Sequence, residues 1–461
     1  MKNRALWATA AGTAAAALVL TGCTGSSEAD TAGDGVVDVW VAFTDDARLG
    51  FVQEKAAEFE QKHEGVTVKV QGFDNYETLF QQMQLALDGG DAPEIVHYFE
   101  AATREALDAV GPDGEPVFQS VSAATGDRDE ILGEPVVLDD VVAPAKNYYS
   151  VDGEFYSMPW NTSSTIMYGN QTMMDEAGID AMPETWQDLE AACDKIAKLA
   201  DGPEACITWP NHSWWMEQAM GQADTNLGNN DNGRSGRATE IDLDSDAMVD
   251  YLTWWQNLEK NGDYLYTGVQ RDWDGTRAAF SAQQVAFLMS SSGDAAGIDE
   301  ESADGGYDVV AGRMPYDADT PYGGNLIGGA TLWLRSGLDE DTTDASLAFL
   351  NFFNNPENAA EWHKVSGYVP ITNSAVDLLT EEGWFDENPN FKVASDQLAL
   401  AADTPASTGV LMGNFVAIRD VITAAAEDIL VQGDDVEERL HAADDEAQQL
   451  LDDYELLYSG E

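Results

Sequence analysis

The sequence predicts an α/β protein made of two lobes or more. At 461 residues the chain is too long for one ordinary hydrophobic core, so we expect it to divide into lobes. Predicted strands and helices alternate between residues 36 and 98, which is typical of an α/β unit with a largely parallel sheet. The hydrophobic content of 44% is that of a globular protein.

The alternation starts at an apolar, β-branched run over 36–43, which predicts a buried first strand. It continues with a helix over 51–63, a strand over 66–70, a helix over 76–87 and a strand over 92–98. Ligands of such sheets bind beyond the carboxyl ends of the strands. Glu100 directly follows the third strand and Tyr76 lies just after the second, so both are expected at a ligand edge.

The middle of the chain holds loops as well as regular elements. Residues 111–135 are rich in Gly, Pro and acid and predict a surface excursion. Residues 155–168 form two apolar strand halves around a cluster of hydroxyls, which is either a crossing point or a site. Thr185 is a cap for a helix that begins at Trp186. A polar loop is expected over 227–246 and an aromatic helix over 248–258.

A helix running into a strand is predicted over 278–289, and three serines and Gly293 follow it. Hydroxyls and N–H groups at a strand end bind anions, although the same residues also make a plain turn. Gly328 and Gly329 head a further strand, where they let a neighbour approach the backbone closely. A helix over 345–353 comes next, and acid-rich helices end the chain.

The stretch 354–372 contains a firmly ended helix. Asn355 is a good N-cap, Pro356 suits the first helical position, and Gly367 suits a left-handed stop. Pro370 prevents the helix from resuming. Such a stop fixes Tyr368, which is either a half-buried structural aromatic or a ligand contact.

The first 22 residues have the pattern of an export signal. Lys2 and Arg4 precede an apolar run too short for an ordinary membrane span, and the run ends in Thr21-Gly22-Cys23. These last residues resemble the lipobox of bacterial lipoproteins, which implies that Cys23 is lipidated; the alternative is a plain signal peptide with a chance cysteine. Residues 23–35 are predicted to form a flexible tether.

Cys193 and Cys206 are the two remaining cysteines. In an exported protein they either form a disulfide or stay as buried thiols. Two thiols without a nearby histidine pair do not make a zinc site, and no metal or cofactor is expected.

The charge and the missing motifs exclude several classes of function. With 22 basic and 84 acidic residues the formal charge is −62, which excludes nucleic-acid binding and suggests a saline surrounding. The sequence has no nucleophile elbow, HExxH, Walker A or dinucleotide-binding motif. Hydroxyls, phenols, strand-end glycines and Arg419 remain, and these suit an anion or a polyol.

Four sequence motifs in the chain resemble those of the sn-glycerol-3-phosphate-binding proteins of bacterial ABC importers, within the extracellular solute-binding proteins. The motifs are Met314-Pro315-Tyr316-Asp317-Ala318-Asp319, Ile327-Gly328-Gly329-Ala330, Pro356-Glu357-Asn358-Ala359-Ala360-Glu361-Trp362-His363 and Gly367-Tyr368-Val369-Pro370-Ile371-Thr372. The resemblance implies a periplasmic-binding-protein-like α/β fold, with the ligand cleft between two lobes joined by several crossings. It suggests lobe 1 from 36–147 and 291–335, and lobe 2 from 148–290 and 336–461. The chain differs from the family in its acidity and in a longer loop around 226–236.

The resemblance also implies a ligand set, carried over residue by residue. It comprises Tyr76, Glu100, Ser163, Trp186, Ser291, Gly329, Tyr368 and Arg419. In this set Arg419 is expected to meet the phosphate, Trp186 to cover the carbon skeleton, and Glu100 to bind glycerol hydroxyls at the end far from the phosphate. The alignment of Ser163 is loose by one position.

The expected function is capture of glycerol-3-phosphate or its diesters by a non-enzymatic monomer, for delivery to ABC permease subunits. The protein is expected to be exported and lipid-anchored to the outer face of the cell membrane. Alternatives are an oligosaccharide receptor of a sugar importer, a secreted glycosidase and a structural surface lipoprotein. A glycosidase needs two carboxylates across the cleft, and the sequence places Glu100 alone there.

Overall fold

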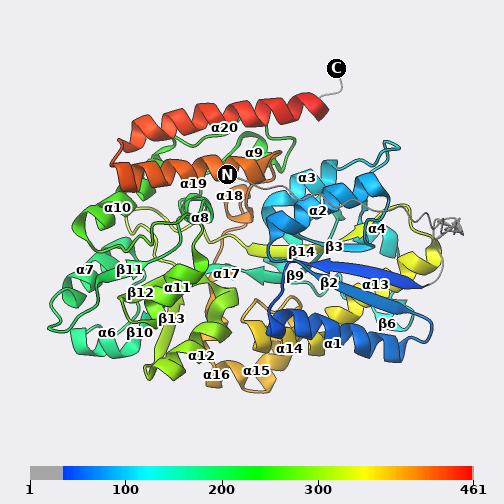
Figure 1. The fold of residues 1–461 in the computed structure, drawn as a ribbon, viewed down its shortest axis with the longest axis horizontal. Coiled ribbons are helices and arrows are strands. Elements are labelled where there is room, and N and C mark those ends of the chain that lie inside the picture. Colours follow the sequence, from blue (N-terminus) through cyan, green and yellow to red (C-terminus); the bar gives the residue numbers. More distant parts are fainter. Residues whose placement is uncertain (1–34, 459–461) are drawn as a thin grey trace, which may run out of the picture.

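The structure is a computed structural model that describes residues 35–458. The predicted signal peptide over 1–22, the lipidation residue Cys23 and the tether up to residue 34 lie outside the described residues. Two sheets lie side by side and form the centres of two lobes, as predicted (Figure 1).

The sheet of lobe 1 has the strand order β2-β1-β3-β14-β4, and β9 also pairs with β14. Its strands are β1 (Val36–Val41), β2 (Thr67–Gly72), β3 (Ile95–Phe99), β4 (Phe118–Gln119), β9 (Met158–Ser163) and β14 (Gly328–Arg335). The β1 strand pairs in parallel with β2 and β3, whereas β14 runs antiparallel to its three neighbours. The predicted parallel unit is therefore confirmed and is extended by strands from later in the chain.

The sheet of lobe 2 has the order β11-β12-β10-β13. Its strands are β10 (Thr165–Asn170), β11 (Ala205–Thr208), β12 (Val285–Ser291) and β13 (Val309–Arg313). Two short hairpins lie outside both sheets: β5 (Glu130–Ile131) with β6 (Glu134–Pro135), and β7 (Ser150–Val151) with β8 (Glu154–Phe155).

Helices cover both sheets (Figure 1). Lobe 1 and its extension carry α1 (Asp46–Lys62), α2 (Tyr76–Gly89), η1 (Glu100–Ala102), α3 (Thr103–Asp108), α4 (Val121–Thr125), α5 (Ala143–Tyr148), α13 (Glu340–Phe353), α14 (Pro356–Ser366), α15 (Asn373–Glu381), α16 (Trp384–Glu387) and η3 (Pro389–Lys392). Lobe 2 carries α6 (Gln171–Ala177), α7 (Trp186–Ile196), α8 (Trp214–Gln222), α9 (Asn229–Gly233), α10 (Asp246–Asn261), α11 (Trp273–Ser281), η2 (Ser292–Asp294), α12 (Ala295–Gly305), α17 (Val393–Leu398), α18 (Pro405–Thr408), α19 (Phe415–Glu427), η4 (Asp428–Gln432) and α20 (Val436–Tyr458).

The chain crosses between the lobes at places that differ from the predicted divisions. The hydroxyl-rich stretch 155–168 is a crossing point, because β9 joins one sheet and β10 joins the other on either side of Ser164. The predicted divisions at 147, 290 and 335 do not match the sheets, since β13 lies in the lobe 2 sheet and α13 packs on β1 of lobe 1. Pairing between distant strands decides these memberships, and local sequence does not reveal it.

Side-chain amides and a hydroxyl fix the crossing segments. Ser164 Oγ donates to the carbonyl oxygen of Leu326 over 2.9 Å, and Gln397 Nε2 donates to Ser164 Oγ over 3.0 Å. Gln218 Nε2 also donates to the Leu326 carbonyl oxygen, over 3.1 Å. These buried bonds tie four distant segments together where the lobes meet.

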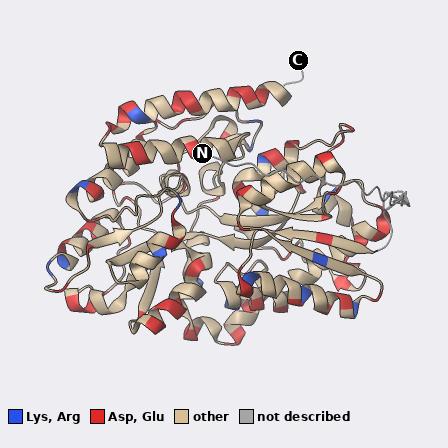
Figure 2. Cartoon of the chain, viewed as in Figure 1, with Lys and Arg blue, Asp and Glu red and all other residues tan. Residues whose placement is uncertain are grey.

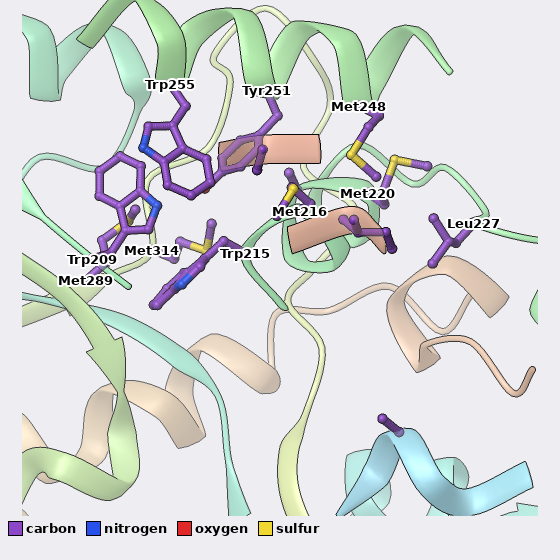
Figure 3. Packing of buried hydrophobic residues seen from close by; sticks show 14 of the residues in the cluster. Trp209, Trp215, Met216, Met220, Leu227, Met248, Tyr251, Trp255, Met289 and Met314 are labelled. Carbon is purple, nitrogen blue, oxygen red and sulfur yellow. The ribbon is translucent and has the colours of Figure 1, made fainter. Parts of the chain in front are cut away.

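Aromatic side chains fill the core of lobe 2. Trp255 and Tyr251 point from α10 towards Trp215 of α8 (Figure 3). The ring of Trp209 lies 5.0 Å from that of Trp255. Such rings bury a large apolar area in fixed orientations, so this core holds α8 rigidly for the site described below.

The structure contains a disulfide between Cys193 and Cys206. It links α7 to β11 across a sequence separation of 13, so the first of the two predicted alternatives is confirmed. Changing both cysteines to alanine is expected to lower the free energy of unfolding by about 3 kcal/mol, because the unfolded chain gains freedom. Urea unfolding at equilibrium measures this difference, and a loss below about 0.5 kcal/mol would contradict the expectation.

Acidic residues are spread over almost every visible helix, including α20, whereas basic residues are few (Figure 2). In residues 35–458 no helix has both the length and the apolar character that a membrane crossing requires.

Candidate functional site

Two groups of polar side chains lie where the lobes meet, and the first contains Tyr76. Asn75 caps α2 by accepting from the N–H of Thr78, so Tyr76 is fixed at the first helical position. Its ring stacks on Phe99 with centroids 5.3 Å apart. Its hydroxyl accepts a bond of 2.8 Å from Asn161 Nδ2.

Tyr368 belongs to the same group, and the firmly ended helix predicted before it is confirmed. Asn355 accepts from the N–H of Asn358 at the start of α14, and Gly367 ends the helix in the left-handed conformation at φ 88°. The ring of Tyr368 then stacks on Trp362 of this helix, with centroids 5.7 Å apart. Burial raises the pKa of Tyr368, and the Arg48 charge and the Asn161 amide oppose this rise. We call Tyr76, Tyr368, Asn161 and Arg48 the tyrosine end.

Arg48 was not among the residues predicted from the sequence. It lies in the first turns of α1, where its Nε donates to Asp45 Oδ2 over 2.7 Å. Its guanidinium carbon lies 4.5 Å from the ring centroid of Phe43, and the Phe43 and Tyr368 centroids are 6.3 Å apart. An arginine near the start of an amphipathic helix gives no sequence signal that separates a ligand contact from a surface charge.

Gly329 and the serine turn pack against the tyrosine end. Gly329 has φ 88°, and a Cβ there would lie 1.9 Å from the carbonyl oxygen of Asn161. In the serine turn, Ser291 Oγ accepts from the N–H of Gly293 over 3.1 Å. A Cβ on Gly293 would lie 2.7 Å from the ring of Tyr368, so this turn of lobe 2 touches lobe 1.

Ser163 is the last residue of β9 and lies opposite Gly328 in the pairing with β14. It is 2% exposed, directly before the crossing at Ser164. The structure thus brings Ser163, Gly329 and Ser291 to the region where the lobes meet.

The second group centres on Arg419 of α19, which lies between two carboxylates. Its Nε and Nη2 donate to the two oxygens of Glu217 over 2.8 and 2.6 Å, and Nη2 also donates to Glu100 Oε1 over 2.6 Å. The expectation that Glu100 lies far from Arg419 is therefore wrong. Glu100 from lobe 1 and Glu217 from lobe 2 meet on one guanidinium, and we call these three residues the carboxylate end.

The carboxylate end carries a net charge of −1 when all three groups are ionised. Burial raises the pKa of Glu100, while Arg419 opposes this shift. Burial would lower the pKa of Arg419, but the two carboxylates outweigh burial and raise it. The guanidinium is thus already neutralised, and the free oxygen lone pairs favour hydroxyl donors over an anion.

The two ends are close to each other. The charge of Glu100 contributes to the raised pKa of Tyr76, after burial and Tyr368. Tyr149 is buried, and burial is the main cause of its raised pKa. Electrostatic interactions with Glu100, Tyr148 and Tyr76 raise this pKa further. In the described part of the chain the Tyr149 hydroxyl has no hydrogen-bond partner. A buried hydroxyl without a partner beside both ends is a natural donor to a bound molecule.

Trp214 is a further residue that sequence reasoning missed. It begins α8, and a Cβ added to Gly328 would lie 2.1 Å from its ring. The indole therefore contacts the strand that carries Gly329, one turn before Glu217 on the same helix. Its indole nitrogen has no hydrogen-bond partner within residues 35–458.

Trp186 does not join the other candidates. Its ring stacks on Trp254 with centroids 4.8 Å apart, and Tyr251 is its other ring contact among the described residues. It lines a cavity of about 190 Å³ in lobe 2, beside Asp250 and Asp317. Trp214, by contrast, lies beside Gly328, where the lobes meet.

The site is rich in hydrogen-bonding groups. Within the described ranges, no cluster of His, Cys, Asp and Glu has the geometry of a metal site. The groups present are phenols, an amide, hydroxyls, two carboxylates and two guanidiniums, contributed by both lobes.

A model of the bacterial extracellular solute-binding proteins matches residues 54–393. The chain belongs to this family. It is therefore a solute-binding protein of the kind that serves ABC importers, and the family description is that of an exported protein. The predicted resemblance to this family is confirmed.

Curated members of the family are similar over most of the chain. The sn-glycerol-3-phosphate-binding periplasmic protein UgpB of Escherichia coli K12 is 31% identical over 391 residues, which cover 83% of this chain and 84% of the relative. The protein of the same name from Salmonella typhimurium is 30% identical, with 83% and 84% covered.

Solved structures show the same two-lobed fold. UgpB from Mycobacterium tuberculosis in complex with glycerophosphocholine has a TM-score of 0.72 at 23% identity, covering 91% of this chain and 99% of that one. The GacH receptor of Streptomyces glaucescens, solved unliganded and with acarbose, has a TM-score of 0.73 at 17% identity, with 91% and 99% covered.

Proposed function

We propose that this solute-binding protein captures sn-glycerol 3-phosphate, a glycerophosphodiester, or both, and delivers them to an ABC importer. The observation that carries the proposal is the separation of the site into a donor-rich tyrosine end and an acidic carboxylate end. A glycerol phosphate has the same polarity, with an anion at one end and vicinal hydroxyls at the other.

The phosphate belongs at the tyrosine end. A phosphate monoester carries about −2 at pH 7, so it would be repelled by the net negative carboxylate end. The phenols of Tyr76 and Tyr368, the amide NH2 of Asn161 and the guanidinium of Arg48 can all donate to it. Asp294 faces the same region, but Ser290 Oγ donates to it over 2.6 Å and Arg277 lies 3.9 Å away, which offsets its charge.

The glycerol hydroxyls belong at the carboxylate end. Glu100 and Glu217 accept hydrogen bonds, and Arg419 holds both carboxylates in place. The face of Trp214 can cover the carbon skeleton. This assignment reverses the predicted role of Arg419, which positions acceptors rather than binding the phosphate.

The relatives support the ligand class. The curated proteins that match over four fifths of the chain are named for binding sn-glycerol 3-phosphate, and one solved relative holds glycerophosphocholine. The same proposal includes lipid anchoring through Cys23, action as a monomer, docking to permease subunits and a role without enzyme activity. The two carboxylates across the site do not favour a glycosidase, because one guanidinium binds both and leaves neither as a free acid.

Isothermal titration calorimetry with five ligands tests the proposal. We expect one-to-one binding of sn-glycerol 3-phosphate or glycerophosphocholine, at least 100-fold tighter than glycerol or inorganic phosphate, because each of these fills one end only. Maltose serves as the oligosaccharide control. Binding of maltose without binding of either phosphate ester would reject the proposal in favour of an oligosaccharide receptor.

A further inference from the structure

An arginine far from the proposed ligand contacts joins the two lobes. Arg237 lies in the loop after α9 in lobe 2, and Asp108 ends α3 in lobe 1. Arg237 Nη1 and Nη2 donate to the two oxygens of Asp108, each over 2.9 Å. This fork-to-fork geometry is the strong, orientation-specific form of an ion pair.

Lobe 2 holds Arg237 in place from its other side. Glu455 of α20 accepts from Arg237 Nη2 over 2.8 Å, and Tyr454 of the same helix donates to Asp108 Oδ2 over 3.0 Å. Figure 1 shows α20 extending above α18 towards α3. One guanidinium therefore links α3 of lobe 1 to the last turns of α20.

The carboxylates of the pair and its neighbour are shielded from water, and the guanidinium is partly exposed. The Asp108 side chain is 5% exposed, that of Glu455 is 15% and that of Arg237 is 28% exposed. Burial alone would raise the pKa of Asp108, but hydrogen bonds from Arg104 and Arg237 hold it below its usual value. A shielded pair of this kind is screened less by salt than an exposed one.

The loop that carries Arg237 is itself rigidly built and makes a second contact. Asn232 Oδ1 accepts from the N–H groups of Leu227 and Gly228 over 2.7 and 3.0 Å, which closes the loop. Arg234 from this loop donates to the carbonyl oxygen of Tyr148 over 2.6 Å and lies over its ring at 4.6 Å. The hydroxyl of Tyr148 in turn donates to the backbone carbonyl oxygen of Glu100.

We infer that Arg237 and Asp108 form a clasp that keeps the lobes closed and so sets how long a captured solute is retained. The clasp stabilises the closed arrangement without touching the ligand, so Arg237 is a positioning residue. Its loss is expected to speed solute release much more than it slows capture, since breaking a shielded charge pair acts mainly on dissociation.

Stopped-flow dissociation and single-molecule energy transfer test the clasp on the full chain. Arg237→Gln is expected to raise the dissociation rate constant of glycerophosphocholine roughly tenfold. Dyes at the exposed positions Leu85 in lobe 1 and Val269 in lobe 2 should report longer distances in the ligand-free variant. Asp108→Asn should have the same effects, and the double variant should add little to either single one.

Arg439→Gln is the matched control, because Arg439 pairs with Asp428 inside lobe 2 over 2.9 Å. It should leave the release rate within twofold of the wild type and the distances unchanged. A wild-type release rate and distance in Arg237→Gln, or equal effects in Arg439→Gln, would overturn the clasp. The release measurement rests on the proposed function, whereas the distance measurement does not. If neither glycerophosphocholine nor sn-glycerol 3-phosphate binds, the proposed function fails while the distances still decide on the clasp.

Discussion

Changing Arg419 to methionine is expected to lower the free energy of unfolding by about 3–5 kcal/mol and to abolish solute binding. The substitution leaves Glu100 and Glu217 buried at 6% and 5% exposure with no cation between them. The two carboxylates would then repel each other or bind protons, and either response destroys the acceptor geometry. Urea unfolding and calorimetry measure the two losses.

Arg271→Met provides the control for this variant. Arg271 pairs with Asp420, which lies next to Arg419 on α19. The Arg271 and Asp420 side chains are 30% and 65% exposed. An exposed pair contributes little, so this change should cost less than about 1 kcal/mol. If Arg419→Met costs no more than Arg271→Met, Arg419 does not hold the carboxylate end together.

Changing Gly329 to alanine is expected to cost about 3 kcal/mol of stability and to weaken solute binding strongly. An alanine at φ 88° is strained, and its Cβ would lie 1.9 Å from the carbonyl oxygen of Asn161. The strand β9 must therefore move, and it carries the Asn161 amide that bonds Tyr76. Equilibrium unfolding and calorimetry of the variant measure both effects.

A control variant at Gly337 distinguishes the cost of backbone strain from the cost of the steric clash with Asn161. Gly337 also has a positive φ, of 72°, but a Cβ there meets nothing within 4 Å. Gly337→Ala should cost about 1 kcal/mol from backbone strain alone and leave binding intact. Equal costs at both glycines would show that the close approach to Asn161 has no energetic importance.

Features that depend on neighbouring residues in the chain were predictable from the sequence. The cap at Asn355, the stop at Gly367 and the cap at Thr185 all form as expected, because each needs only residues within one helical turn. The same holds for the alternation of β1, α1, β2, α2 and β3, whose apolar periods are local. Local signals thus placed Tyr76 at the start of α2 and Glu100 directly after β3, and they fixed Tyr368 directly after the end of α14.

Features that depend on distant pairing were not predictable. Arg419 meets Glu100 across 319 positions and Glu217 across 202, so no local pattern reveals that its charge is already used. Trp186 and Trp214 both begin a helix, and only the packing of α8 against Gly328 distinguishes their environments. The lobe divisions were wrong for the same reason, since strand pairing decides them.

The position of the phosphorus atom in a crystal structure with sn-glycerol 3-phosphate tests the two-ended site most directly. We expect the phosphate oxygens within about 3 Å of the hydroxyls of Tyr76 and Tyr368, at hydrogen-bonding distance. The glycerol hydroxyls should then contact Glu100 and Glu217, with Arg419 still bound to both carboxylates. A phosphate bound to Arg419, with either carboxylate displaced, would contradict the proposed orientation.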